Sequence, residues 1–274
     1  MILLHLAVIA LYALATWALW PLPPDRGGSP PSAARKNRAS AALWLLPVTL
    51  ALHAWVAERS IVHPDGFDLS LANALSVVAG LVAVIAWISG LLRSLPAIGA
   101  VVLPVAAVAS LLPALMPGSS RFAYAAQPWA AVHIAVALVA YALFMVAALQ
   151  ALVLIGLEKR LHGRLPDPAA ADLPPLLTLE RFLFRLVTAG FVLLTFTLCS
   201  GMLFSEEIFG KPLVVSHKSV FSFLGWLTFG GLLWGRWRYG WRGRVALRWI
   251  LAGTAFVFLA YLGYKFVLEV LLGR

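Results

Sequence analysis

Long uncharged, apolar stretches recur along the whole chain, and short polar connections separate them. Each stretch is long enough to cross a hydrocarbon core of ~30 Å as a helix, and none alternates with the two-residue period of a transmembrane strand. The pattern therefore predicts an all-α fold, a polytopic integral membrane protein with eight transmembrane helices. The predicted spans are residues 2–20, 39–57, 69–92, 94–116, 129–157, 182–204, 216–235 and 246–272.

The composition agrees with a single membrane domain over residues 1–274. Hydrophobic residues make up 62% of the chain and charged residues 12%, whereas soluble domains carry roughly 25% charged residues. The longest connection, residues 158–181, is rich in proline, so no sizeable soluble domain is expected. The single cysteine, Cys199, excludes an internal disulfide and a Cys-x-x-Cys-His haem attachment, and we expect it to be a small buried hydrophobe.

Lysines and arginines predict the orientation. The first, third, fifth and seventh connections, with the adjoining helix ends, hold fifteen of the 21, and the other connections and both tails hold six. Because basic residues are retained on the cytoplasmic side, both termini are predicted to lie outside the membrane (N-out/C-out). The net charge of +10 then reflects topology and contact with anionic lipids at the cytoplasmic face, and no nucleic-acid partner is expected.

Four of the six histidines lie near the external end of a predicted span. They are His5, His53, His133 and His217. An imidazole at membrane depth must stay neutral or find a partner, and it normally faces the protein interior. Two interpretations stay open: each histidine forms a hydrogen bond between helices, or the four converge on one shared site.

Haem suits a shared imidazole site in a membrane. Haem iron accepts neutral imidazole as an axial ligand, and Lys218, Lys265 and Arg121 could supply cations for the propionates. Zinc or copper would also accept imidazole, but zinc sites usually add a carboxylate or thiolate, and no acidic residue falls in the central part of any span. Lys265 and Glu269 are spaced i, i+4, which favours an ion pair over propionate binding.

Other classes of function find less support. No glycine-rich phosphate loop, Ser/His/Asp set or pair of catalytic carboxylates is present, so we expect that the chain is not an enzyme. A transporter ranks last because few polar residues lie mid-helix. The alternative to haem binding is a cofactor-free membrane scaffold or regulatory protein whose histidines are purely structural.

Three stretches carry a family resemblance: "PWAAVHIAVALVAYALF" (128–144), "LERFLFRLVTAGFVLLTFTLCSG" (179–201), and residues 217–266, which begin "HKSVFSFLGW" and contain the turn "GWRGR". The chain resembles the CcsA/ResC-like cytochrome c assembly family, most strongly over residues 128–272. Its size and its His-Lys pair are closest to the small YpjD/HemX-like inner-membrane branch.

The resemblance implies a haem site. His133 matches the family's transmembrane haem-ligand histidine, and His217 is the second candidate metal ligand. His53 and His5 are candidates for the opposite ligand or a second position, and Lys218 and Lys265 complete the predicted cofactor-binding set. Residues 205–217 lack the Trp-rich pattern of haem-presenting members. We therefore expect non-covalent b-type haem handling or transfer at the periplasmic face, linked to cytochrome c biogenesis or haem homeostasis, with a possible membrane protein partner.

Overall fold

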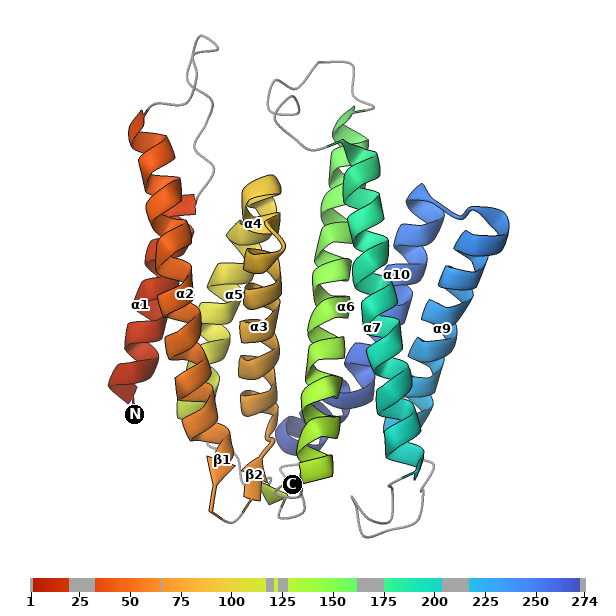
Figure 1. Ribbon diagram of the computed structural model, residues 1–274. Coiled ribbons are helices and arrows are strands. Elements are labelled where there is room, and N and C mark those ends of the chain that lie inside the picture. The colour runs from red at the N-terminus through yellow and green to blue at the C-terminus, as the bar shows by residue number, and fades with distance from the viewer. Residues whose placement is uncertain are drawn as a thin grey trace.

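The computed structural model describes residues 2–19, 33–64, 66–116, 121–122, 128–161, 175–203 and 217–271. Within these ranges the chain is built from long helices that lie side by side and alternate in direction (Figure 1). They are α1 (Ile2–Leu19), α2 (Ala33–Ile61), α3 (Leu71–Ile88), α5 (Pro96–Leu115), α6 (Pro128–Leu161), α7 (Leu176–Leu203), α9 (His217–Tyr239) and α10 (Gly243–Phe258). A single turn, α4 (Leu91–Ser94), precedes α5.

Each predicted span falls on one of these helices, so the all-helical class is confirmed. Among the described residues, six helical segments are long and apolar enough to cross a membrane: α1, α3, α5, α6, α7 and the last, Gly243–Leu271. Helices α2 and α9 are not among these six. The first turns of α2 read "AARKNRAS", and α9 has a charged residue near each end. Eight transmembrane spans therefore stay a prediction.

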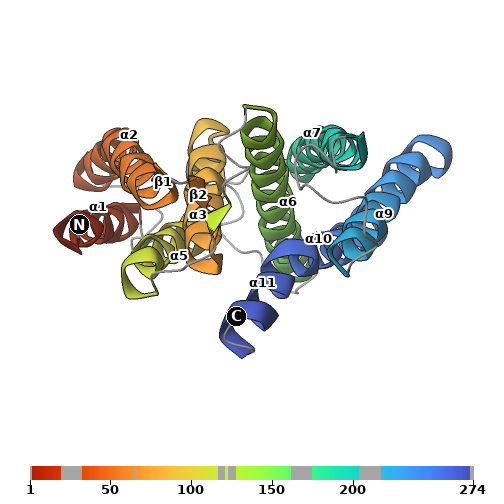
Figure 2. The ribbon, with the colours of Figure 1, turned by 90° about the horizontal axis from the view of Figure 1, so that it is seen from below.

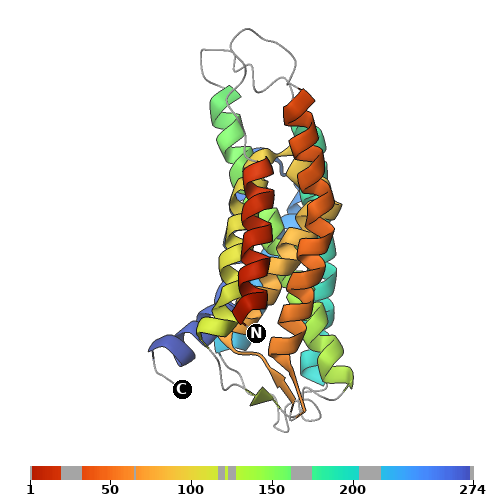
Figure 3. The same ribbon diagram turned by 90° about the vertical axis from the view of Figure 1, so that its left-hand side faces the viewer.

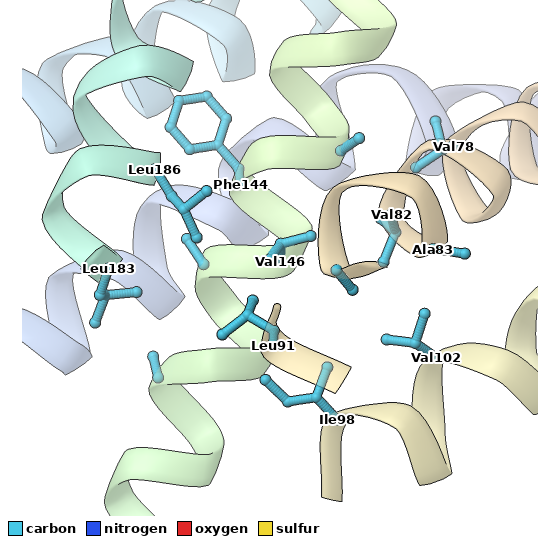
Figure 4. Packing of buried hydrophobic residues seen from close by; sticks show 14 of the residues in the cluster. Val78, Val82, Ala83, Leu91, Ile98, Val102, Phe144, Val146, Leu183 and Leu186 are labelled. Atoms are coloured by element: carbon cyan, nitrogen blue, oxygen red, sulfur yellow. The ribbon is translucent and has the colours of Figure 1, made fainter. Parts of the chain in front are cut away.

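The helices form two groups of four. Helices α1, α2, α3 and α5 form an N-terminal bundle, and α6, α7, α9 and α10 form a C-terminal bundle, with α3 packed against α6 between them (Figure 2). One continuous apolar core runs through both bundles. Figure 4 shows its central part, where Val78 and Val82 of α3 lie on one side and Val146 of α6 on the other.

Phe144 of α6 lies at the centre of the C-terminal bundle. Its ring stacks on Phe229 of α9, with ring centroids 3.9 Å apart and an interplanar angle of 8°. Two glycines make the approach possible. A Cβ atom on Gly190 of α7 would lie 2.8 Å from the Phe144 ring, and one on Gly253 of α10 would lie 2.8 Å from the Phe229 ring. All four helices of the bundle thus meet at one aromatic pair.

A tight turn joins α9 to α10. Gly240 (φ 67°) and Gly243 (φ 56°) adopt the left-handed backbone conformation that glycine tolerates without strain. The Trp241 ring folds back onto Gly235 of α9, a position where a side chain would collide with the ring. The geometry of the turn thus favours glycine at positions 235, 240 and 243.

A small antiparallel sheet marks one end of the bundles (Figure 3). It consists of β1 (Val62–His63), β2 (Gly66–Asp68) and β3 (Arg121–Phe122), in the order β1-β2-β3. The sequence pattern did not predict it, because strands of two or three residues carry no readable period. We call the end of the bundles that carries this sheet the sheet end. The opposite end, where Arg181, Arg185, Arg236, Arg238, Arg242 and Arg244 lie, is called the arginine end.

The last helix changes its winding at the sheet end. After α10 the chain continues as the π-helical turns η3 (Leu259–Gly263) and η4 (Val267–Leu271), with a short α-helical piece, α11 (Tyr264–Phe266), between them. The Tyr261 hydroxyl donates a hydrogen bond to the Leu69 carbonyl (3.0 Å), and the Leu71 amide donates to Glu269 Oε2 (2.7 Å). The C-terminal segment thus caps the first turn of α3, far away in the sequence.

The predicted ion pair between Lys265 and Glu269 is present. Lys265 Nζ donates a hydrogen bond to Glu269 Oε1 over 2.8 Å, and the lysine side chain is only 7% exposed. The carboxylate therefore serves two partners, the buried ammonium group and the Leu71 amide. This local interpretation of the i, i+4 spacing is confirmed.

Cys199 is exposed on α7, not buried as predicted. The reason is that a membrane helix directs apolar side chains outward into lipid as well as inward.

Trp226 lies in the middle of α9. Its indole N–H donates to Thr195 Oγ1 over 2.9 Å, and its ring stacks on Phe191. Trp226 thus joins α9 to α7.

Adding a methyl group at either central glycine is expected to destabilise the C-terminal bundle. Gly190→Ala and Gly253→Ala each force an aromatic ring to shift, which should cost about 1–3 kcal/mol of unfolding free energy. Gly156→Ala is the matched control, because a Cβ there meets no atom within 4 Å. Thermal unfolding of the detergent-solubilised protein measures the effect. Equal melting temperatures for all three variants would contradict the packing.

Removing the Glu269 carboxylate is expected to loosen the start of α3. Glu269→Ala leaves a buried ammonium group and a helix-terminal amide without their shared acceptor, which should cost about 2–3 kcal/mol. The control is Glu158→Ala, which breaks the pair with Arg244, a side chain that is 61% exposed; little change is expected there. Hydrogen exchange should quicken at the Leu71 amide in the first variant only. Unchanged exchange there would disprove the cap.

Candidate functional site at the sheet end

The four histidines of the predicted spans lie toward the same end of the bundles. Helices α1, α6 and α9 begin at the sheet end and α2 finishes there (Figure 1), which places His5, His133, His217 and His53 at that end. They do not gather at one point. His5 and His53 belong to the N-terminal bundle, and His133 and His217 to the C-terminal one. In the described part of the chain, no three His, Cys, Asp or Glu side chains are placed to hold a metal ion.

His53 joins three helices and uses both ring nitrogens to do so. Its Nδ1 pairs with the Tyr12 hydroxyl of α1 (2.9 Å), and its Nε2 pairs with Ser76 Oγ of α3 (3.0 Å). The ring is 2% exposed and lies where Gly80 of α3 leaves room, since a Cβ there would be 3.1 Å from it. In this arrangement neither nitrogen presents a lone pair to a metal.

His5 lies in the same bundle, near His53 and equally buried. Its Nδ1–H donates a hydrogen bond to the Ser110 carbonyl of α5. A carbonyl oxygen can only accept, so this bond fixes the tautomer and leaves the proton off Nε2. Together, His5 and His53 connect α1, α2, α3 and α5 with polar bonds inside an apolar bundle.

His133 lies on α6, against α7. Its Nδ1 is 2.8 Å from Ser200 Oγ, and Ser200 Oγ itself donates to the Thr197 carbonyl (3.2 Å). When the hydroxyl proton is used in that second bond, the oxygen accepts from Nδ1–H, and Nε2 then carries the lone pair. The ring is half-buried, and Gly201 lets α7 lie close to it, since a Cβ at that glycine would be 3.4 Å from the ring. A metal-binding histidine is usually oriented by such a bond on its other nitrogen.

Lys218 lies near His133 and links it to a second lysine and two tyrosines. Lys218, in the first turn of α9, is close enough to His133 and to Lys265 for their charges to interact. Its Nζ lies 5.3 Å from the centre of the Tyr261 ring, and that ring packs edge-on against Tyr141 of α6 at 6.3 Å. Three of the predicted site residues, His133, Lys218 and Lys265, thus come together in the C-terminal bundle.

The remaining candidates lie apart from this cluster or outside the description. His217 is the exposed first residue of α9, next to Lys218. His63 lies in β1, where its Nε2 bonds the Ser60 carbonyl (3.1 Å), as expected for a residue of a connection. The side chain of Arg121 and the whole of His162 lie outside the described residues.

Sequence reasoning missed the partners that orient the histidines. Ser200 and Ser76 were visible only as small polar residues inside apolar runs, and Tyr12, Tyr141 and Tyr261 as ordinary aromatic residues. A polar side chain at membrane depth is a signal in itself, because it requires a partner there. Naming that partner requires the order of helix packing, which the spacing of residues does not contain.

Comparison with known proteins identifies relatives along most of the chain. The profile of the family described as "Cytochrome C assembly protein" matches residues 40–272. The "Inner membrane protein YpjD" of Escherichia coli K12 is 32% identical over 231 residues, which cover 82% of this chain and 85% of that protein. A protein of Azospirillum brasilense described as an "Uncharacterized 28.8 kDa protein" is 37% identical over 145 residues, 53% of this chain and 54% of that protein.

A more distant relative is the "Cytochrome c biogenesis protein CcsA" of Thermosynechococcus vestitus. It is 26% identical over 209 residues, 61% of this chain and 66% of that protein. No solved structure matches the chain at a significant level.

Proposed function

Because the chain belongs to the cytochrome C assembly protein family, we propose that it binds haem non-covalently at the sheet end and hands it on in cytochrome c biogenesis or haem homeostasis. The chain is a multi-pass inner-membrane protein, similar to YpjD. The observation that carries the proposal is the state of His133. Its Nδ1 is paired with Ser200 Oγ, and in the tautomer in which Nδ1–H donates to that oxygen, Nε2 is the deprotonated nitrogen that an iron ligand needs.

The residues around His133 fit a haem group. His133 would hold the iron through its imidazole, and haem bound there would supply an iron centre for transfer or sensing. Lys218 is the cation that we assign to the propionates, since its ammonium group lies 5.3 Å from the Tyr261 ring and close enough to His133 for their charges to interact. Tyr141 and Tyr261 add aromatic surface beside the lysine. His217, adjoining Lys218, is the candidate for the opposite ligand.

His5 and His53 are not assigned to this site. They stay candidates for a second position in the N-terminal bundle, where the bonds of His53 to Tyr12 and Ser76 would first have to break. We further propose that the chain carries out no catalysis and acts by binding, with a membrane protein as its partner in transfer. Anionic lipids at the cytoplasmic face complete the proposed partners, and nucleic acid is not among them.

A cofactor-free scaffold or regulatory protein is the second candidate function. The observation that favours it is the saturation of His53, whose two ring nitrogens both serve helix contacts. If His133 has the same role, its bond to Ser200 only joins α6 to α7. The two functions predict different visible absorption spectra for the purified protein.

The protein purified from haem-replete cells is expected to show a Soret band that depends on His133. His133→Ala should remove it, and His63→Ala, a control outside the cluster, should leave it intact. Ser200→Ala should weaken haem binding about tenfold, because the orienting bond is lost while the ligand stays. Haem titration followed by visible absorption measures all three.

Absence of the band from the wild-type protein, or a band unchanged in His133→Ala, would refute the site. Melting temperatures measured on the same samples separate loss of haem from loss of fold. A scaffold with structural histidines would lower the melting temperature of His133→Ala without any spectral change.

We also propose that all eight long helices span the membrane, with both termini outside. The arginines at the arginine end support the cytoplasmic assignment of that end, because positively charged connections are retained inside. Arg236 and Glu180 pair there at 3.1 Å, as do Arg244 and Glu158 at 3.3 Å. In this orientation the sheet end and His133 face the periplasm.

Labelling of single cysteines is expected to show this orientation. In a Cys199→Ser background, Pro64→Cys at the sheet end should react with a membrane-impermeant maleimide in intact cells. Arg242→Cys at the arginine end should react only after the cells are permeabilised. Both residues are exposed, and the parent Cys199→Ser protein is the unlabelled control. The reverse pattern would invert the topology.

A further inference from the structure

An open groove lies between α7 and α9 at the arginine end, whereas His133 lies toward the opposite, sheet end. Its volume is about 630 Å³, and Arg181, Arg185 and Arg236 line one part of it while Ala189, Val192 and Leu233 line the rest. The two helices pack side by side along this face (Figure 1). We propose that the groove binds one anionic phospholipid, with its phosphate on the arginines and an acyl chain along the apolar part.

The arginine part of the groove is positively charged and partly fixed in place. Arg236 Nη1 donates to Glu180 Oε1 (3.1 Å), and its guanidinium carbon lies 3.5 Å from the centre of the Phe184 ring. Arg181 and Arg185 are exposed one turn apart on α7, and neither pairs with a carboxylate of the described chain. Three guanidinium groups against one carboxylate leave a net positive charge, and arginine suits the fork geometry of phosphate.

The apolar part continues the groove toward the middle of the membrane. Between Arg181 and Leu193 the helix advances by about 18 Å, at a rise of 1.5 Å per residue. One leaflet contributes about half of a ~30 Å hydrocarbon core, so the groove reaches from headgroup depth to about the bilayer midplane. Val192, at the deep part, is 59% exposed. Charge at one end and aliphatic lining at the other match the two parts of a phospholipid.

A partner transmembrane helix would fit the apolar part but not the arginines. Such a helix would bring its apolar face along α7 and would need carboxylates at headgroup depth to balance the charge. Lipid supplies both parts in one molecule and surrounds the protein at all times. The proposal rests on the membrane location of the chain and is independent of haem binding.

Native mass spectrometry of the full-length protein with added phosphatidylglycerol tests the site. The wild-type protein is expected to retain phosphatidylglycerol in preference to phosphatidylcholine. The variant Arg181→Gln/Arg185→Gln should lose affinity by roughly fivefold for each arginine removed. The variant Arg238→Gln/Arg248→Gln changes the net charge equally with exposed arginines outside the groove, and it should retain the lipid.

A third variant, Ala189→Phe, fills the apolar part without altering charge and should also reduce retention. Melting temperatures confirm that each variant is folded. Equal losses in the two double-arginine variants would show attraction to general surface charge and overturn the site. Equal binding of phosphatidylcholine, or full retention in Ala189→Phe, would overturn it as well. Co-purification of a stable protein that competes with the lipid would assign the groove to a partner helix instead.

Discussion

The stacked pair of Phe144 and Phe229 is the contact on which the C-terminal bundle depends. Lipid tails are as apolar as leucine, so helices in a membrane associate through close packing and not through exclusion of water. The two rings lie 3.9 Å apart because Gly190 and Gly253 have no side chain to hold α7 and α10 away. The same helices position His133, Ser200 and Lys218, so the geometry of the candidate site follows from this packing.

A second feature is that most polar side chains inside the bundles form hydrogen bonds within the protein. Gln150 donates to the Leu179 carbonyl (2.8 Å), and several threonines donate to carbonyls one turn earlier. The same hydrogen bonding decides what each histidine offers. His53 is bonded through both nitrogens and has become part of the framework. His5 donates from Nδ1 and keeps a basic Nε2, whereas the Nδ1 of His133 pairs with the Ser200 hydroxyl.

The sequence was informative about features that depend on local spacing. Apolar runs placed each long helix, and the i, i+4 spacing of Lys265 and Glu269 gave their ion pair. Features that depend on which helix packs against which were not predictable. The location of the four histidines toward one end of the bundles was predictable, because successive helices alternate in direction. Their division between two bundles was not predictable. The π-helical turns and the bond from Leu71 to Glu269 were not predictable either, because no periodic pattern in the sequence marks them.

The bond between Leu71 and Glu269 joins residues 198 positions apart. During synthesis the first turn of α3 leaves the ribosome long before the carboxylate that caps it exists. In the interval its amide must be satisfied by water or lipid headgroups, so the N-terminal bundle is complete only after the last helix has been released into the bilayer. The cap of α3 at the sheet end can therefore form only after the last helix of the chain has been synthesised.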